Sequence, residues 1–176
     1  MRRYRPRGPG NIRFGRGRYK IVFLVLALAV MAYRFIRQPE SLAPQSLQPC
    51  AEQTGCFTGT VTKVVDGDTL DISNVRVRLV LVDAPERETR EGPAATAYLK
   101  ELCPEGSAAR LQRDRFQPED PYGRTLGAVW CGARATSSDL PVNAEMIRSR
   151  HARLYGRFCR ESEFGSAPWA VELGCR

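Results

Sequence analysis

Residues 64–86 read VVDGDTLDISNVRVRLVLVDAPE, and they decide how the rest of the chain folds. The runs TLDIS and VRVRLVLV are rich in β-branched residues and partly alternate, which is typical of strands. The polar pair Ser73 and Asn74 between them predicts a short turn. The stretch therefore predicts an antiparallel hairpin.

Acidic residues lie at both ends of this predicted hairpin. Asp66 and Asp68 precede the first strand, and Asp83 and Glu86 follow the second. Because antiparallel pairing brings the start of one strand beside the end of the other, we expect the four carboxylates to gather there. Oxygen ligands without histidine or thiolate favour calcium or magnesium over zinc or copper. The alternative is a solvated Asp-Gly-Asp turn, which is a common loop sequence.

Arginines on the second strand add a second chemical signal. Arg76 and Arg78 are two positions apart, so they share one face of that strand. A guanidinium offers a planar fork of donors that matches two phosphate oxygens. Carboxylates, a metal and arginine at one end of a hairpin together predict phosphodiester chemistry.

The order of motifs resembles the staphylococcal nuclease (thermonuclease) family. The resemblance runs from about residue 58 to residue 155 and rests on VVDGDTL, VRLVLVDAPE, GPAATAYL, DPYGRTLGAVW and VNAEMI. It implies an α+β fold, namely an OB-fold barrel of five strands with three helices. It also implies calcium-dependent cleavage of phosphodiester bonds in DNA and RNA, within strands or from their ends, leaving 3′-phosphate ends.

The resemblance also implies a metal site. Asp68 and Asp83 look like the calcium carboxylates, and Ala84 is expected to offer its backbone carbonyl, with Asp66 beside them but not bound to the ion. Ala84 stands where the best-known members have threonine. The substitution removes a hydroxyl and leaves the carbonyl in place.

Roles for the catalytic and binding residues follow from the same resemblance. Glu86 looks like the general base, Arg78 and Arg124 like the phosphate-binding arginines, and Tyr122 and Tyr155 like the tyrosines that line the phosphate pocket. The match near Tyr155 departs from the family pattern, because HARLYGRF lacks the glycine that is usual a few residues upstream.

Composition supports one domain with an appendage. The chain has 176 residues and a formal charge of +8. Residues 1–20 hold seven arginines and one lysine, whereas from Gln38 onward acidic residues outnumber basic residues by 19 to 17. A nucleic-acid enzyme with this charge distribution has no broad positive field and depends on local arginines and a metal.

The basic segment precedes a candidate membrane anchor. Residues 1–20 are predicted to be a disordered cytoplasmic tail, with RNA binding by its arginines as an alternative. Residues 21–36 contain the apolar run IVFLVLALAVMAY, and the charge asymmetry around it places the N-terminus in the cytoplasm. Thirteen apolar residues are short for a span, but Lys20 and Arg34 extend it to 18 residues by reaching the headgroups.

The competing interpretation of residues 21–36 is a cleaved signal peptide, with Val30 and Ala32 before a cut at Tyr33. We expect an uncleaved single-pass anchor in a bacterial inner membrane, with residues 56–176 as a periplasmic nuclease domain. The alternative is secretion after cleavage. Residues 37–55 are polar and proline-rich, which is typical of a linker.

Six cysteines follow the apolar run, and an even number in an exported domain indicates disulfides. Zinc is disfavoured because the chain has no CxxC pair and His151 has no second histidine. Fifteen connectivities are open for six cysteines. Sequence proximity favours the pairs Cys50 with Cys56 and Cys159 with Cys175, which leaves Cys103 and Cys131 to pair across the barrel.

Two functional hypotheses remain at this stage. The first is a monomeric, membrane-tethered, calcium-dependent nuclease that acts on DNA and RNA. The second is a non-catalytic OB-fold module that binds nucleic acid, polysaccharide or a protein partner. The presence of all five charged residues at the positions that the family uses favours the enzyme.

Overall fold

The structure is a computed structural model that describes residues 25–29, 31, 48–50, 54–136 and 140–176. The chain divides into two compact units, Met1–Ser41 and Leu42–Arg176. In the first unit, residues 25–29 and 31 are helical. None of the helices in the described ranges is long and apolar enough to cross a membrane. The other residues of the predicted anchor, the basic tail and most of the linker lie outside the described residues.

The second unit is built on a closed barrel of five strands, as predicted. The main sheet runs in the order β1-β2-β3-β4-β7-β6, and an additional pairing of β2 with β6 closes it. All neighbours pair antiparallel except β4 and β7, which are parallel. The strands are β1 (Gln48–Pro49), β2 (Cys56–Val64), β3 (Thr69–Ile72), β4 (Val75–Leu79), β6 (Ala108–Arg113) and β7 (Thr125–Cys131).

Strand β1 lies inside the segment predicted as a linker. It pairs with the start of β2, with Gln48 opposite Thr58 and Pro49 opposite Phe57. The folded unit therefore begins before Cys56, where the nuclease domain was predicted to start. The proline content that indicates a linker is compatible with a two-residue edge strand.

The predicted hairpin is present, but its second strand is shorter than predicted. Ser73 and Asn74 form the turn with φ of 45° and 68°. The run VRVRLVLV predicts one continuous strand, whereas β4 ends at Leu79 and Leu81 takes a φ of 61°. This left-handed residue turns the chain out of the barrel sheet. The chain continues as β5 (Val82–Asp83), which pairs with β8 (Arg153–Leu154) in a separate two-stranded sheet.

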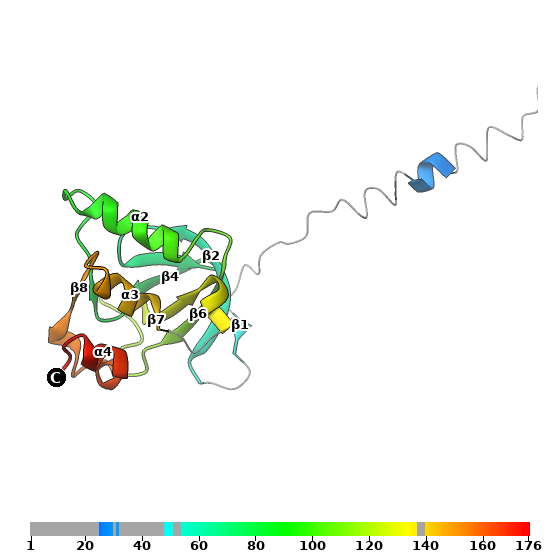
Figure 1. Cartoon of the computed structure of the whole chain (residues 1–176). Coiled ribbons are helices and arrows are strands. Elements are labelled where there is room, and N and C mark those ends of the chain that lie inside the picture. Colours follow the sequence, from blue (N-terminus) through cyan, green and yellow to red (C-terminus); the bar gives the residue numbers. More distant parts are fainter. Residues whose placement is uncertain (1–24, 30, 32–47, 51–53, 137–139) are drawn as a thin grey trace, which may run out of the picture. The chain divides into compact units, whose positions relative to one another are not determined.

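Three α-helices are found among residues 48–50, 54–136 and 140–176, as predicted. They are α2 (Gly92–Leu102), α3 (Val142–Arg148) and α4 (Pro168–Glu172), and Figure 1 shows α2 and α3 next to the barrel strands. Short 3-10 helices are η1 (Gly132–Thr136), η2 (Gly156–Phe158) and η3 (Glu163–Ser166). Proline lies in the first turn of α2 and begins α4, and at both positions its missing N–H costs no helical hydrogen bond.

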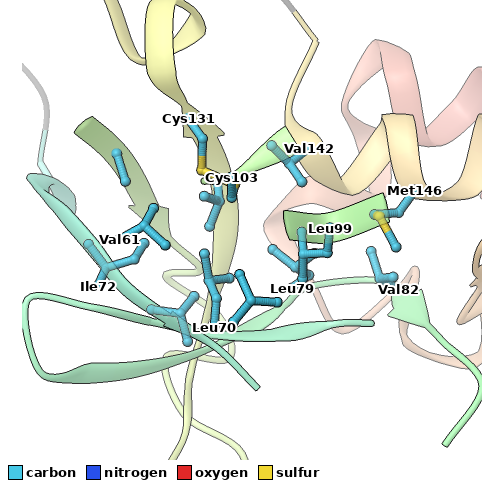
Figure 2. Close-up of a cluster of buried hydrophobic side chains, with 14 of the residues drawn as sticks. Val61, Leu70, Ile72, Leu79, Val82, Leu99, Cys103, Cys131, Val142 and Met146 are labelled. Atoms are coloured by element: carbon cyan, nitrogen blue, oxygen red, sulfur yellow. A yellow bond between two sulfur atoms is a disulfide. The ribbon is translucent and has the colours of Figure 1, made fainter. Parts of the chain in front are cut away.

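The main core lies between the barrel strands and the first two of these helices. Figure 2 shows Leu99 of α2 and Met146 of α3 directed toward Leu79 and Val82. These four side chains are at most 1% exposed. A second buried cluster joins the barrel to the C-terminal segment and contains Val80, Leu81, Ala128, Phe164 and Trp169.

Three disulfides tie this unit together. They join Cys50 to Cys56, Cys103 to Cys131, and Cys159 to Cys175, and no cysteine is free. The first and third are the pairs favoured by sequence proximity, and the second is the pair that remained. Cys103 follows α2 and Cys131 ends β7, so the second disulfide attaches the helix to the barrel.

Candidate active site

The Asp-Gly-Asp sequence forms the tight turn between β2 and β3. Val65 and Asp66 donate backbone hydrogen bonds to the carbonyl of Thr69, and the Asp66 carboxylate accepts from the Asp68 N–H at 3.1 Å. A Cβ at Gly67 would lie 2.7 Å from the Cβ atoms of both Ala84 and Ala95. Glycine therefore lets the turn pack against α2 and against the segment after β5.

Asp68 is the buried centre of the site. Its side chain accepts hydrogen bonds from the Ala84 N–H and the Thr69 hydroxyl, both at 3.0 Å. Its Oδ2 also pairs with Nη1 of Arg78 at 2.5 Å. The residue is 7% exposed. These contacts bring together the start of β3, the end of β4 and the segment after β5, as the hairpin predicts.

Burial raises the pKa of Asp68 to about 6, and the negative charge of Asp66 adds to the increase. Arg78 and the N–H of Ala84 act in the opposite direction without cancelling the effect of burial. A buried carboxylate with a raised pKa gains free energy when a cation binds beside it.

The four predicted acidic residues are not gathered as a metal cluster. Within the described residues, no three side chains of His, Cys, Asp or Glu are placed together to hold a metal. Asp66 is used in closing its own turn, while Asp83 and Glu86 are exposed. The physical reason is that Asp68 is buried against Arg78 and a backbone N–H, whereas Asp83 and Glu86 are at solvent-exposed positions.

The donor set nevertheless fits a hard cation. Asp68 and Asp83 are carboxylates, Ala84 has a backbone carbonyl, and all three are oxygen donors of the kind that Ca²⁺ prefers. Burial raises the pKa of Asp68, so a cation beside this carboxyl would favour its charged form. With so few protein oxygens, a cation here would keep several water ligands.

Four predicted residues line one cleft of about 790 Å³, which we call the Arg78 cleft. They are Arg78, Arg124, Tyr122 and Tyr155. Tyr122 is 84% exposed, and the guanidinium of Arg124 lies 5.3 Å from its ring centroid. Arg78 of β4, Arg124 just before β7 and two aromatic rings line the same space, which suits a phosphate with its attached nucleoside.

Sequence reasoning missed two residues of this cleft. Asp120 forms an ion pair with Nε of Arg124 at 2.6 Å and accepts from its backbone N–H at 3.0 Å. Burial raises the pKa of Asp120, but the hydrogen bonds from Arg124 and Tyr122 outweigh burial and lower it. Arg157, which lies against the rings of Tyr155 and Phe158, is the second missed residue. For Asp120, the signal in the sequence was its position four residues before Arg124.

Glu86 lies in the loop between β5 and α2. Its backbone carbonyl accepts from the N–H and the hydroxyl of Thr89, at 2.9 and 2.7 Å. A Cβ at Gly92 would lie 2.0 Å from the carbonyl oxygen of Glu86, so glycine is required where the loop meets α2. Among the described residues, the carboxylate of Glu86 makes no hydrogen bond or ion pair, and it is exposed to solvent.

Asp83 and Ala84 line a second cleft of about 690 Å³, which we call the Asp83 cleft. The two linings include neighbouring residues of the chain: Val82 and Tyr155 line the first cleft, while Asp83 and Arg153 line the second. Six predicted site residues therefore line one cleft or the other, whereas Asp66, Asp68 and Glu86 line neither. Asp68 connects the two linings through its contacts with Arg78 and Ala84.

Comparison with known proteins is consistent with this site. The family model described as "Staphylococcal nuclease homologue" matches residues 76–167. Relatives include "Protein ParB" of Escherichia coli, 36% identical over 109 residues, which are 56% of this chain and 59% of the relative. An "Uncharacterized endonuclease" of Escherichia coli O157:H7 is 33% identical over 104 residues, with 57% and 62% covered. The "Thermonuclease" of Staphylococcus intermedius is 32% identical over 122 residues, with 64% and 68% covered.

The match spans about three fifths of the length of the first of these relatives. The matched residues include Arg78, Asp83, Glu86 and Arg124 in one continuous segment. That segment covers more than half of the chain, and the Staphylococcus intermedius relative is matched over more than two thirds of its length. The chain belongs to the family of staphylococcal nuclease homologues.

Proposed function

We propose that this protein is a calcium-dependent nuclease that hydrolyses phosphodiester bonds in DNA and RNA and leaves 3′-phosphate ends. The observation that carries the proposal is the lining of the Arg78 cleft by Arg78, Arg124, Tyr122 and Tyr155, next to the buried carboxylate of Asp68. Relatives named endonuclease and thermonuclease support the same reaction class. We propose that one chain suffices, since all of these residues come from a single chain.

In the proposed mechanism, Arg78 and Arg124 hold the phosphate and stabilise the charge that develops on it. Asp120 keeps Arg124 in position through its ion pair. Glu86 accepts a proton from the attacking water. Asp68, Asp83 and the carbonyl of Ala84 would hold Ca²⁺, which supplies positive charge to the phosphate when bound.

Replacing Asp68 by asparagine tests the metal assignment. The change removes the charge with little change in volume, so we expect weaker Ca²⁺ affinity and activity that is partly restored by more Ca²⁺. Mg²⁺ is expected to support little turnover, because its stricter octahedral shell misplaces the phosphate relative to Glu86. The measurement is the cleavage rate of single-stranded DNA and RNA against the concentration of each ion, with chelator as the blank.

Asp71→Asn is the matched control for this experiment, because Asp71 pairs with Arg76 on the exposed side of the hairpin. It is expected to leave the Ca²⁺ dependence unchanged. Cleavage that persists in chelator, or equal support by Mg²⁺, would refute the calcium site. Binding of strands without any cleavage would favour an OB-fold binding module instead.

We also propose that residues 21–36 anchor the protein in a bacterial inner membrane, with the nuclease domain in the periplasm. The apolar run between basic flanks and the three disulfides of the domain support this location. We expect the full chain to stay in the membrane fraction through high salt and alkaline wash. A soluble product that begins near Tyr33 would show secretion after signal cleavage.

A further inference from the structure

The Asp83 cleft contains a concentration of positive charge that the proposed mechanism does not use. Arg90, Arg150 and Arg153 line it, and all three are exposed. They come from three separate places: the loop before α2, the turn after α3, and strand β8. Among the described residues, none of the three forms an ion pair, although seven other arginines do.

Acidic side chains in the same cleft do not offset this charge. The cleft also contains Asp83 and Glu91. Asp83 belongs to the proposed cation site, where its charge is compensated when the ion is bound. Glu91 alone is then left against three arginines. The cleft is therefore a local positive site in a domain whose acidic residues outnumber its basic residues.

The position of Arg150 carries a second, independent signal. Its φ is 63°, in the left-handed region where a residue with a side chain costs about 1–2 kcal/mol relative to glycine. Hydrogen bonds from Arg150 N to Ile147 O at 3.0 Å, and from His151 N and Ala152 N to Met146 O at 3.1 and 3.0 Å, hold the turn. The fold thus maintains an arginine in a conformation that favours glycine, at the edge of the cleft. Such strain is typical of functional positions.

The wall of the cleft is rigid beside Arg150. The ring of His151 stacks on Tyr98 of α2, with centroids 4.2 Å apart and planes at 13°. Nδ1 of His151 lies 2.9 Å from the hydroxyl of Ser149. These contacts fix the turn against the helix, so the arginines on either side of His151 project from a supported backbone.

We infer that the Asp83 cleft is a phosphate subsite for the polynucleotide on the opposite side of the scissile bond from the nucleotide in the Arg78 cleft. This inference rests on the proposed nuclease function. Val82 in the lining of one cleft is followed by Asp83 in the lining of the other, and Asp68 contacts Arg78 of the first lining and Ala84 of the second, so we expect one strand to reach both. Guanidinium groups bind phosphate oxygens irrespective of the base. The subsite therefore increases the affinity for longer strands without selecting their sequence.

The test compares two substrates, a dinucleotide with one phosphodiester bond and a single strand of about 12 nucleotides. The double variant Arg90→Gln/Arg153→Gln, made in the full chain, removes two of the three charges. We expect KM for the long strand to rise about tenfold, so that it is no longer lower than KM for the dinucleotide. We expect kcat to change by less than about twofold. The slope of log affinity against log salt for a fluorescent strand should decrease by about 1.4, measured with Ca²⁺ in the Glu86→Gln background so that the strand stays intact.

Arg160→Gln/Arg176→Gln is the matched control, since both residues are exposed, line neither cleft and give the same change in net charge. The inference is overturned if the two double variants behave alike, or if both substrates lose activity equally. A wild-type protein that binds the strand through Arg90 and Arg153 but cleaves neither substrate would refute the proposed nuclease and leave the binding site standing. Failure of the wild-type protein to bind or cleave would refute both.

Discussion

Replacing Glu86 by glutamine is expected to lower kcat by at least ~10², with the fold intact. Glutamine has nearly the size and shape of glutamate but cannot accept a proton from water near neutral pH. The backbone of residue 86 is held by Thr89 and by close packing against Gly92, and neither contact uses the carboxylate. The loop should therefore keep its conformation, and the lost rate can be assigned to the missing base.

The measurement is the rate of cleavage of a single-stranded oligonucleotide at saturating Ca²⁺. Glu88→Gln is the control, because Glu88 is an exposed residue of the same loop and its replacement makes the same change in charge. A loss in kcat with little change in KM would support a role in the transition state. Full activity of Glu86→Gln, or an equal loss in Glu88→Gln, would contradict the general-base assignment.

The barrel could be predicted because its strands are set by local signals. The alternation in VRVRLVLV, the Ser73-Asn74 turn and the run TLGAVWC each favour one local structure, and the family resemblance supplies the strand order. The resemblance also supplies the three helices, two of which have proline in their first turn. Strand ends were predicted less well. β6, for example, ends at Arg113, because the buried carboxylate of Asp114 accepts from Phe116 N and Gln117 N and closes a turn.

The break after β4 could not be predicted from the residues. Leu81 is apolar and unbranched at Cβ, and nothing in VRVRLVLV indicates a positive φ. Tertiary contacts impose it: Val80 N donates to Gly127 O at 3.0 Å, and Tyr155 N donates to Leu81 O at 2.9 Å. This break is what divides the site residues between two clefts. Antiparallel pairing of two continuous strands instead predicts all four carboxylates in one cluster.

The second large effect is expected at Asn143, which holds this break in place. Asn143 is 0% exposed, and its side chain accepts from Val129 N at 3.0 Å and donates to Val80 O at 2.9 Å and Gly127 O at 3.1 Å. Both polar atoms of the amide, Oδ1 and Nδ2, therefore make hydrogen bonds to the backbone. Asn143 links α3 to β7 and to Val80, the residue that follows β4.

Asn143→Asp keeps the shape and buries a carboxylate. It removes the hydrogen bonds that the carbonyls of Val80 and Gly127 accept from the amide, and Gly127 O keeps only the bond from Val80 N among these. We expect the free energy of unfolding to fall by about 3 kcal/mol. Urea unfolding with the disulfides intact measures it as a lower midpoint at an unchanged slope. Asn74→Asp, in the exposed turn, should change the free energy of unfolding by less than about 0.5 kcal/mol.

Val80 precedes Leu81, which redirects the chain to Asp83 and Ala84. Asn143→Asp should therefore also lose cleavage activity at urea concentrations below its unfolding midpoint. Unchanged stability would mean that backbone pairing alone, and not Asn143, sets the end of β4.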